Sequence, residues 1–228
     1  MKIIHFNEID STNNYGKNLI RSKNFTHGSL ITADTQTGGR GRFERSFFSV
    51  GGLYMSVLLD ARHIDYPLTC AAAVSVAETV QEEYGINLSI KWVNDLLYNK
   101  KKVCGILTEA VCNEQGKLLG FICGIGLNTE HTHLPDELQS IATFLPVSKK
   151  GLAKKIAAKL LHFYETEFPI MPIYKKNLLL DINVDVYQNN EFQYSGYAFD
   201  INDAGNLLVS EGENRHILSS GEISIKLS

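Results

Sequence analysis

The pattern of apolar and polar positions in the first part of the chain predicts a strand, a helix and two further strands. Residues 1–8 are typical of a short strand, and the run DSTN at 10–13 offers capping side chains for a helix that continues to about Arg21. The runs GSLITAD at 28–34 and LYMSVLL at 53–59 are predicted as strands. The chain that joins these two strands is rich in glycine and arginine, which indicates a basic, flexible loop.

The middle of the chain predicts a helix packed on a sheet. Apolar residues recur at four-residue spacing from Leu68 to Val80, which indicates a helix over 67–84 with Gly85 as its C′ residue. Three later segments are strand-like, and the last two are joined by a hairpin connection: 88–92, 103–111 and 118–127. The sheet is therefore expected to be mixed or antiparallel.

A second amphipathic helix is predicted over 152–168, and proline residues break its pattern. Pro169 and Pro172 follow the last apolar position, so we expect the main domain to end there. The predicted main domain comprises residues 1–180.

Residues 181–228 have a different character, with short alternating apolar runs punctuated by turn residues such as Asn189 and Asn190. This pattern predicts a small β-barrel docked on the main domain, because so short a segment buries little core by itself. The predicted fold class is α+β, with a mixed or antiparallel sheet that has helices on one face, followed by a small C-terminal β-barrel.

Composition narrows the class of function. The chain has 228 residues, of which 44% are hydrophobic and 21% charged, as in ordinary globular proteins. Its net charge is −3, so no global positive field exists to bind DNA or RNA. The four cysteines form no CxxC pair, which indicates buried reduced thiols. There is no signal peptide and no apolar run of about 20 residues, so we expect a cytoplasmic protein without a membrane segment.

The segment TQTGGRGRFER at 35–45 is the most informative part of the sequence. Glycines that alternate with arginines combine an adaptable backbone with bidentate cations, which suits a phosphate or carboxylate ligand. The segment matches neither the P-loop nor the dinucleotide-binding pattern. By itself it is equally consistent with a solvated basic surface loop.

Two further segments carry candidate chemistry. KWVND at 91–95 is followed by KKKVCGIL at 100–107, so polar and basic groups interrupt apolar strands for a second time. Taken separately, Trp92 is typical of a core residue and the lysines of a solvated hairpin tip. A shared anionic ligand explains both basic segments together. GIGLN at 124–128 adds glycines that allow close approach to the backbone.

Six motifs in this order resemble the biotin protein ligase family, whose members are also called biotin–acetyl-CoA-carboxylase ligases. They are DSTN at 10–13, QTGGRGRFER at 36–45, LYMS at 53–56, KWVND at 91–95, KVCGILTE at 102–109 and GIGLN at 124–128. The resemblance covers about residues 3–170 and implies a biotin/lipoate ligase-like catalytic domain, with an SH3-like module at the C-terminus. It also implies a monofunctional ligase without an N-terminal DNA-binding domain, because DSTN begins at residue 10.

The resemblance implies that biotin reacts with ATP to form biotinyl-5′-AMP, with Mg²⁺, and is then transferred to a lysine of a biotin carboxyl carrier domain of a carboxylase. It assigns catalysis to Lys102 and Arg42 and the Mg²⁺ site to Asp95. The implied biotin-binding residues are Ser11, Thr12, Asn13, Gln36, Arg40, Gly41, Arg42, Lys102 and Gly105. The implied nucleotide-binding residues are Gly39, Arg40, Arg42, Phe47, Lys91, Trp92, Asn94 and Asn128. The resemblance is compatible with a homodimer through the central sheet and equally with a ligand-free monomer, and it implies no DNA or membrane partner.

The sequence departs from the family pattern in the basic loop. Glu44 stands where the family commonly has glycine, and Phe47 stands where it commonly has tryptophan. Phe47 can still stack on adenine with a smaller area, whereas Glu44 adds a negative charge near the expected phosphate. The alternative functions are a lipoate or octanoyl ligase of the same fold, a biotin-sensing repressor, and a non-catalytic adaptor. GRGR and KWVND favour biotin, and an adaptor need not keep Arg42 and Lys102.

Overall fold

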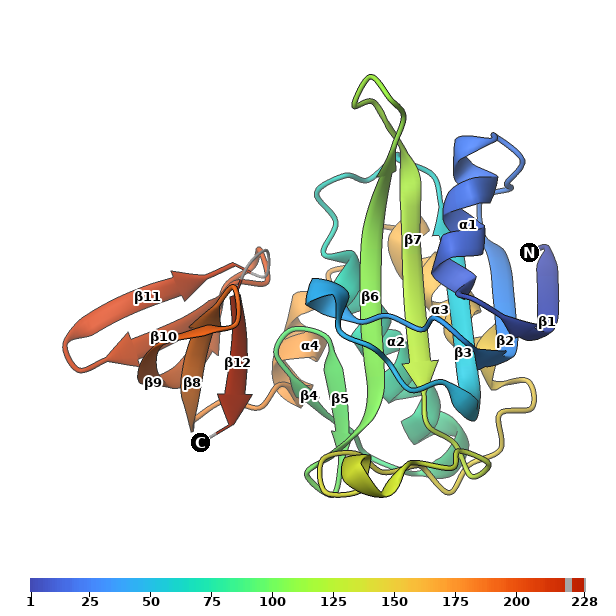
Figure 1. The fold of residues 1–228 in the computed structure, drawn as a ribbon. Coiled ribbons are helices and arrows are strands. Elements are labelled where there is room, and N and C mark those ends of the chain that lie inside the picture. The colour runs from blue at the N-terminus through green and yellow to red at the C-terminus, as the bar shows by residue number, and fades with distance from the viewer. Residues whose placement is uncertain (220–222, 228) are drawn as a thin grey trace.

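A computed structural model describes residues 1–219 and 223–227, without the side chains of Glu44, Ile223, Ser224 and Leu227. Its main element is a seven-stranded mixed sheet, shown in Figure 1. β1 pairs with β2 in parallel and every other pairing is antiparallel. In spatial order the strands are β1 (Ile3–Ile9), β2 (Ser29–Gln36), β3 (Val50–Leu59), β7 (Leu118–Leu127), β6 (Lys101–Cys112), β5 (Asp95–Tyr98) and β4 (Ser89–Lys91).

Helices cover both faces of this sheet, which corrects the expectation of helices on one face. α2 (Leu68–Tyr84) and α3 (Leu152–Glu165) pack on one face, and α1 (Thr12–Arg21) packs on the other (Figure 1). The side chains of β3 alternate accordingly, because Val57 belongs to the large core under α2 and α3 while Leu58 belongs to a small core with α1. The mixed α+β fold itself is confirmed.

One helix begins and another ends at the residues predicted from the sequence. Ser11 is the N-cap of α1, and its side chain accepts a hydrogen bond from the Asn14 backbone N–H at 3.4 Å. Gly85 ends α2 with φ +68°, a left-handed conformation that glycine adopts without steric cost. The start of α1 matters for function, because it places Asn13 over the central strands, where it contacts Ser56 of β3 and the Leu107 carbonyl of β6.

One strand and one α-helix were not predicted. β5 (Asp95–Tyr98) follows a turn at residues 92–94, so Asp95 starts a strand where a turn was expected. α4 (Met171–Asn177) begins with Pro172 in its first turn, a position that needs no backbone N–H. Pro172 therefore lies at the start of a further helix, after α3 has ended at Glu165.

The C-terminal residues form a second, five-stranded antiparallel sheet, in the part of the chain where the sequence predicted a small β-barrel. Its spatial order is β11 (Asn214–Leu218), β10 (Leu207–Glu211), β9 (Glu191–Ile201), β8 (Ile182–Gln188) and β12 (Ile223–Leu227). Apolar side chains of this sheet, including Val184 and Leu207, belong to the same buried cluster as those of the large sheet. The division into 1–180 and 181–228 stays a prediction, since one apolar core joins the two sheets.

Polar contacts also join the two sheets. The Trp92 indole N–H donates to the Gly205 carbonyl at 3.0 Å, and Lys175 of α4 pairs with Asp200 of β9 at 2.6 Å. The backbone N–H of Leu179 donates to the Ile90 carbonyl at 2.8 Å. These contacts hold the small sheet beside the end of the large sheet that carries β4 and β5.

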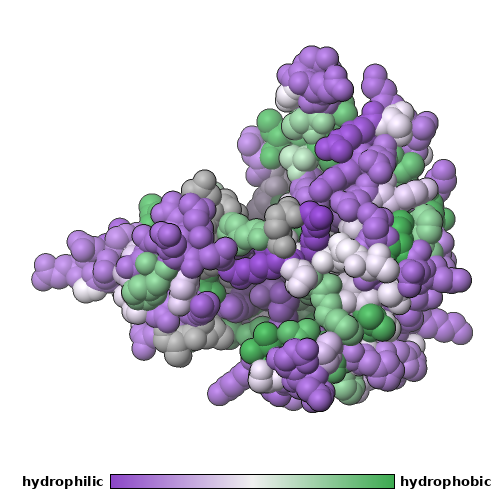
Figure 2. Space-filling view, viewed as in Figure 1, coloured by the Kyte–Doolittle hydropathy of each residue, from purple (hydrophilic) through white to green (hydrophobic). Residues whose placement is uncertain are grey.

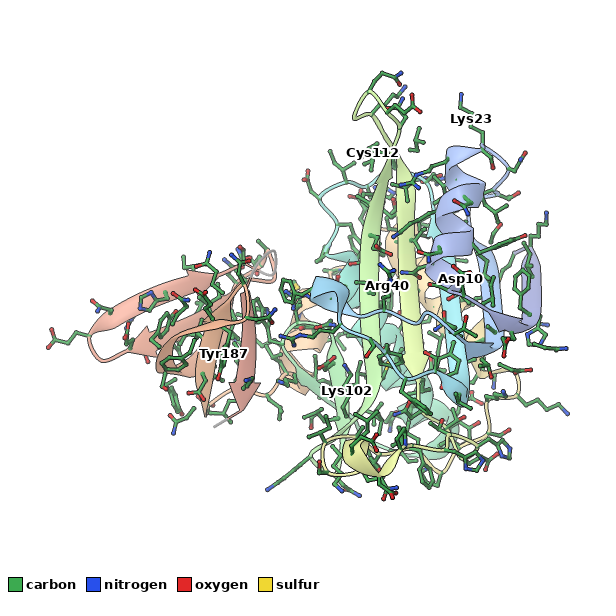
Figure 3. All side chains as sticks on the ribbon, in the orientation of Figure 1. Asp10, Lys23, Arg40, Lys102, Cys112 and Tyr187 are labelled. Atoms are coloured by element: carbon green, nitrogen blue, oxygen red, sulfur yellow. The ribbon has the colours of Figure 1, made fainter. Side chains whose placement is uncertain are left out.

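All four cysteines are free. Three of them are buried, as expected, but Cys112 is exposed. It lies at the end of β6 away from Lys102 (Figure 3). A short 3-10 turn, η2 (Asp136–Leu138), follows β7. Within the described residues, no helix has the length and apolar character needed to cross a bilayer.

Candidate active site

A cavity of about 310 Å³ opens on the sheet face that carries α1, between that helix and the small sheet. Hydrophilic residues gather in this hollow (Figure 2). Fourteen residues predicted for the site line it: Ser11, Thr12, Asn13, Gln36, Arg40, Gly41, Arg42, Phe47, Lys91, Trp92, Asn94, Asp95, Lys102 and Gly105. Segments that are far apart in the sequence therefore meet around one cavity.

Other lining residues were not assigned to the site from the sequence: Phe43, Arg45, Ser46, Met55, Ile106, Leu107, Gly124, Ile125, Gly126, Ile141 and Ile225. Most of them lie inside or beside the predicted motifs. Their place within these motifs is the feature of the sequence that could have assigned them to the site. Ile141 and Ile225 come from segments without a motif, and only the tertiary fold brings them to the cavity.

A buried hydrogen-bond network forms one end of the cavity. The Thr12 backbone N–H and hydroxyl both donate to Gln36 Oε1, at 2.9 and 3.1 Å. The Ser56 hydroxyl lies 2.7 Å from Thr12 Oγ1 and 2.6 Å from Asn13 Oδ1. Asn13 Nδ2 donates to Glu109 Oε2 at 2.9 Å. The network fixes the polar side chains at this end, so a ligand meets groups that are already oriented.

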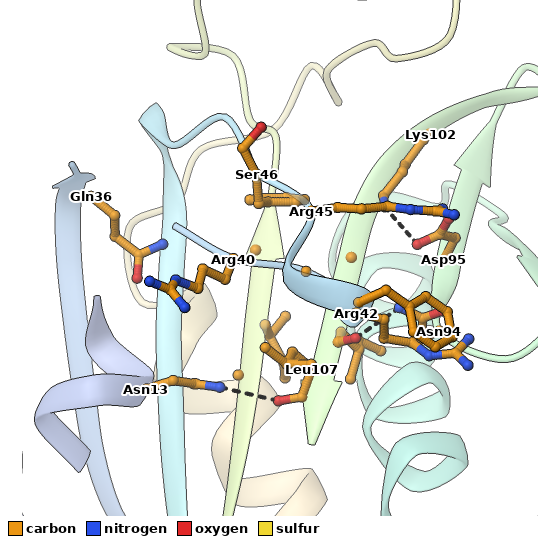
Figure 4. Close-up of a pocket in the computed structure, with 18 of the residues that line it drawn as sticks. Asn13, Gln36, Arg40, Arg42, Arg45, Ser46, Asn94, Asp95, Lys102 and Leu107 are labelled. Atoms are coloured by element: carbon orange, nitrogen blue, oxygen red, sulfur yellow. Dashed lines mark hydrogen bonds and ion pairs between the residues drawn. The ribbon is translucent and has the colours of Figure 1, made fainter. Parts of the chain in front are cut away.

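Cations form the opposite end. Arg42 and Arg45 reach it from the loop, Lys91 from the end of β4 and Lys102 from β6, whereas the Arg40 side chain points toward Gln36 at the polar end (Figure 4). Asp95 is the single carboxylate among the described lining residues. The excess of positive charge suits an anionic ligand with more than one charge.

Lys102 and Asp95 form an ion pair within the cavity, with Nζ and Oδ1 2.6 Å apart. Burial lowers the pKa of Lys91 and of Arg42, and the Asp95 carboxylate opposes the shift in both. Asp95 thus stabilises the protonated forms of neighbouring cations before any ligand binds.

Phe47 lies on two glycines of the sheet. A Cβ atom on Gly105 would lie 2.9 Å from Phe47 Cε2, and one on Gly126 would overlap with Phe47 Cε1. The Lys102 amine lies 5.5 Å from the centroid of the same ring. Both glycines are needed because any side chain there would displace the ring.

Gly126→Val is therefore expected to reduce the free energy of unfolding by about 1–3 kcal/mol, the usual cost of overpacking. Urea denaturation measures this change. Adding Phe47→Ala should recover part of the loss, because the ring that collides is then absent. Strictly additive effects of the two substitutions would contradict the contact.

The basic loop folds as a small hairpin with a tight turn at its tip. The Phe47 N–H donates to the Gly39 carbonyl at 2.9 Å, and the Gly41 N–H donates to the Arg45 carbonyl at 2.8 Å. The tip is a 3-10 turn, η1 (Arg42–Glu44), in which Phe43 has φ +57°. The Glu44 side chain, a concern in the sequence, lies outside the described residues.

Two predicted nucleotide-binding residues do not line the cavity. Gly39 closes the loop hairpin, where a Cβ atom would lie 2.6 Å from the Phe47 carbonyl oxygen. Asn128 is buried, and its Nδ2 donates to the Thr143 carbonyl at 2.9 Å. Their places in this structure are structural ones, a hairpin closure and a loop anchor.

Two other residues have contacts that sequence reasoning missed. Trp92 lines the cavity, but its indole N–H donates a hydrogen bond to the Gly205 carbonyl of the small sheet. Asn94 donates through Nδ2 to the Ile106 carbonyl at 2.9 Å, which fixes the turn before β5. No group of three or more potential metal-binding side chains occurs within the part of the chain that the structure describes.

Comparison with known proteins gives consistent matches. A family model described as the biotin/lipoate A/B protein ligase family matches residues 5–128. The chain is 33% identical to the bifunctional ligase/repressor BirA of Bacillus subtilis, over 98% of this chain and 74% of that protein. It is 25% identical to the biotin–[acetyl-CoA-carboxylase] ligase of Mycobacterium tuberculosis, over 86% of this chain and 78% of that protein.

Among solved structures, the biotin protein ligase from Aquifex aeolicus in complex with biotin and ATP matches with a TM-score of 0.84 and 29% identity. The match covers 100% of this chain and 99% of that chain. The segment matched by the family model contains all the cavity-lining residues except Ile141 and Ile225. The chain belongs to the biotin/lipoate A/B protein ligase family.

Proposed function

We propose that this protein is a biotin protein ligase, which activates biotin with ATP and transfers the biotinyl group to a lysine of a carrier domain. The observation that carries the proposal is the full-length structural match to a ligase solved with biotin and ATP. The cavity supports it, because one end is a fixed polar network and the other end is cationic. Biotin has a polar ureido ring at one end and a carboxylate at the other.

In the first step the carboxylate of biotin attacks the α-phosphorus of ATP. A carboxylate oxygen–phosphorus bond forms, the bond to the β-phosphate oxygen breaks, and pyrophosphate leaves with its electron pair. We assign Lys102 and Arg42 to the negative charge on the reacting carboxylate and phosphate, since both line the cationic end. No protein nucleophile is required.

At the polar end, Ser11, Thr12, Asn13 and Gln36 are assigned to the ureido group. Their network leaves few ways for these side chains to rearrange, so binding costs little ordering entropy. Gly105 and Gly41 keep the backbone close to the ligand, and Arg40 extends from the loop above it. Lys91, Trp92, Asn94 and Phe47 are assigned to the nucleotide.

Mg²⁺ is compatible with the residues present as an ion that arrives with the nucleotide. It usually keeps several waters and binds one or two carboxylates together with substrate phosphates, and Asp95 is the carboxylate available in the cavity. When bound, Mg²⁺ supplies neutralisation of phosphate charge. Asp95 would have to exchange its contact with Lys102 for the metal.

In the second step the uncharged amine of the acceptor lysine attacks the carbonyl carbon of biotinyl-adenylate. An amide bond forms, AMP leaves, and the amine loses a proton. The partner we propose is the biotin carboxyl carrier domain of a carboxylase. The loop must exclude water until the acceptor arrives, since water would hydrolyse the mixed anhydride.

Incubation with biotin, ATP, Mg²⁺ and a carrier domain tests the function directly. Intact-mass analysis should show the carrier gaining one biotinyl group, and no gain when its acceptor lysine is replaced by arginine. Parallel reactions with lipoate or octanoate test the other substrates of the family. Modification by lipoate and not by biotin would overturn the assignment.

The oligomeric state and the cellular location remain predictions. A homodimer through the central sheet predicts a doubled mass by light scattering, most clearly with biotin and ATP present. The cytoplasm is the expected compartment, because the reaction consumes ATP.

We expect the loop to become protected when ligands bind. Arg40, Arg42 and Arg45 lie in a hairpin held by a few backbone hydrogen bonds, so trypsin should cleave there rapidly in the free protein. Biotin, or biotin with ATP, should slow cleavage by closing the loop. Mass spectrometry of the fragments measures the rate, and equal rates in all states would exclude a closing loop.

A further inference from the structure

We propose that the β8–β9 turn of the small sheet positions the basic loop, and that Asn190 and Arg45 form the contact that does so. Both are positioning residues, because neither is assigned to a reacting atom. The proposal deepens the proposed ligase function and rests on it for its effect on the intermediate. The contact between Asn190 and Arg45 and its effect on the loop can be tested without catalysis.

The contact joins the loop tip to a rigid turn. The Arg45 guanidinium donates to Asn190 Oδ1, although the two residues are 145 positions apart. Asn189 and Asn190 have φ values of +51° and +67°, as in the tight turns that join hairpin strands. Asparagine tolerates this conformation and also offers a side-chain acceptor, whereas glycine would supply the conformation alone.

The turn is fixed to the large sheet by other contacts. Trp92 donates to the Gly205 carbonyl and Lys175 pairs with Asp200, so the small sheet does not depend on the loop for its place. Ile225 of β12 lines the same cavity as the loop arginines. The small sheet thus presents a fixed acceptor at the rim of the cavity.

Arg45 is linked to Arg42 through the turn that both residues belong to. The Arg45 N–H donates to the Arg42 carbonyl at 3.3 Å. Their guanidinium groups lie 5.7 and 4.7 Å from the centroid of the Phe43 ring. Phe43 has φ +57°, a conformation that non-glycine residues keep only when surrounding contacts hold it.

Anchoring Arg45 therefore restrains the backbone that carries Arg42. The loop of the ligand-free protein still opens, but the contact shifts the equilibrium between the open and the folded loop toward the folded form. With biotinyl-adenylate in the cavity, the same shift keeps Arg42 over the phosphate. Losing the contact should increase opening of the loop and release of the intermediate in parallel.

The test compares three substitutions in one turn. Asn190→Gly keeps the backbone conformation and removes the acceptor, and Asn190→Asp keeps an acceptor. Asn189→Gly is the matched control, because it changes the neighbouring residue with positive φ and leaves Asn190 in place. Amide hydrogen exchange of residues 40–46 in the ligand-free protein reports loop opening, and thermal unfolding reports any loss of fold.

Asn190→Gly should raise the exchange rate of residues 40–46 by about three- to tenfold, the effect of one hydrogen bond of typical net strength. Asn190→Asp and Asn189→Gly should stay near wild type. In a double-mutant cycle, Arg45→Met should raise exchange similarly and add little to Asn190→Gly. Equal exchange in Asn190→Gly and Asn189→Gly would overturn the proposal.

The second arm measures release of biotinyl-adenylate, by rapid filtration of enzyme preloaded with labelled biotin and ATP. Release should rise about three- to tenfold in Asn190→Gly and not in Asn189→Gly. A wild-type protein that forms no adenylate would contradict the ligase function, and the exchange data would still decide the contact. A wild type that forms adenylate and an Asn190→Gly variant that retains it equally well would overturn the positioning role.

Discussion

Replacing Lys102 with alanine is expected to slow biotin-dependent exchange between ATP and pyrophosphate by about 100- to 1,000-fold, the effect of one electrostatic donor in an active site. Lys102 is the assigned cation that β6 extends into the cavity, and its partner there is Asp95. Removing the amine takes away a positive charge aimed at the reacting groups. It also leaves the carboxylate unpaired near an incoming phosphate.

Lys101→Ala is the matched control, because the adjacent lysine donates to the Gln139 carbonyl at 2.7 Å and does not line the cavity. An exchange rate for Lys102→Ala within about threefold of wild type would remove Lys102 from the mechanism, since tenfold already corresponds to 1.4 kcal/mol.

The double variant Lys102→Ala/Asp95→Asn separates two roles of Asp95. If the carboxylate only balances Lys102, removing its charge should restore part of the lost activity. If it also binds Mg²⁺, the double variant should be slower than Lys102→Ala alone, and the Mg²⁺ concentration needed for half-maximal activity should rise.

Replacing Arg42 with glycine is expected to raise the release of biotinyl-adenylate by about 10- to 150-fold, because a charge-assisted pair contributes roughly 1.5–3 kcal/mol. Arg42 is partly buried at the loop tip, and burial lowers its pKa without removing its charge. Lys102 remains to support slower activation. Free adenylate then acylates exposed lysines on any protein nearby.

Streptavidin blotting of serum albumin incubated with enzyme, biotin and ATP measures this release. Arg62→Gly is a suitable control, since Arg62 pairs with Asp60 and does not line the cavity. If albumin stays unlabelled while Arg42→Gly modifies a carrier domain at the wild-type rate, Arg42 belongs to a solvated loop and has no role in retention.

Local patterns predicted most of the fold because they act over a few residues. Ser11 caps the start of α1 with its side chain, and Gly85 ends α2 with its backbone conformation. Both roles depend on the residue itself and could therefore be predicted from the sequence. β5 was missed because the polar residues Asn94 and Asp95 are typical of turns, and here the turn precedes Asp95. The two helix layers were missed because periodicity gives a helix an apolar face without saying which side of the sheet it covers.

The site could be predicted where residues lie in motifs and not where the fold alone brings them together. Arg40, Arg42 and Lys102 stand in basic segments that an anionic ligand explains. By contrast, nothing near Asn190 in the sequence indicates that its side chain meets Arg45. Contacts of this kind depend on how two sheets dock, which no local pattern encodes.

Trp92 gives the protein an intrinsic optical probe. It is the single tryptophan of the chain, it lines the cavity, and its N–H is bonded to a carbonyl of the small sheet. Its emission therefore originates at one defined point. Ligand occupancy and separation of the small sheet would both change the polarity around the indole, so a stopped-flow trace could follow either event without an attached dye.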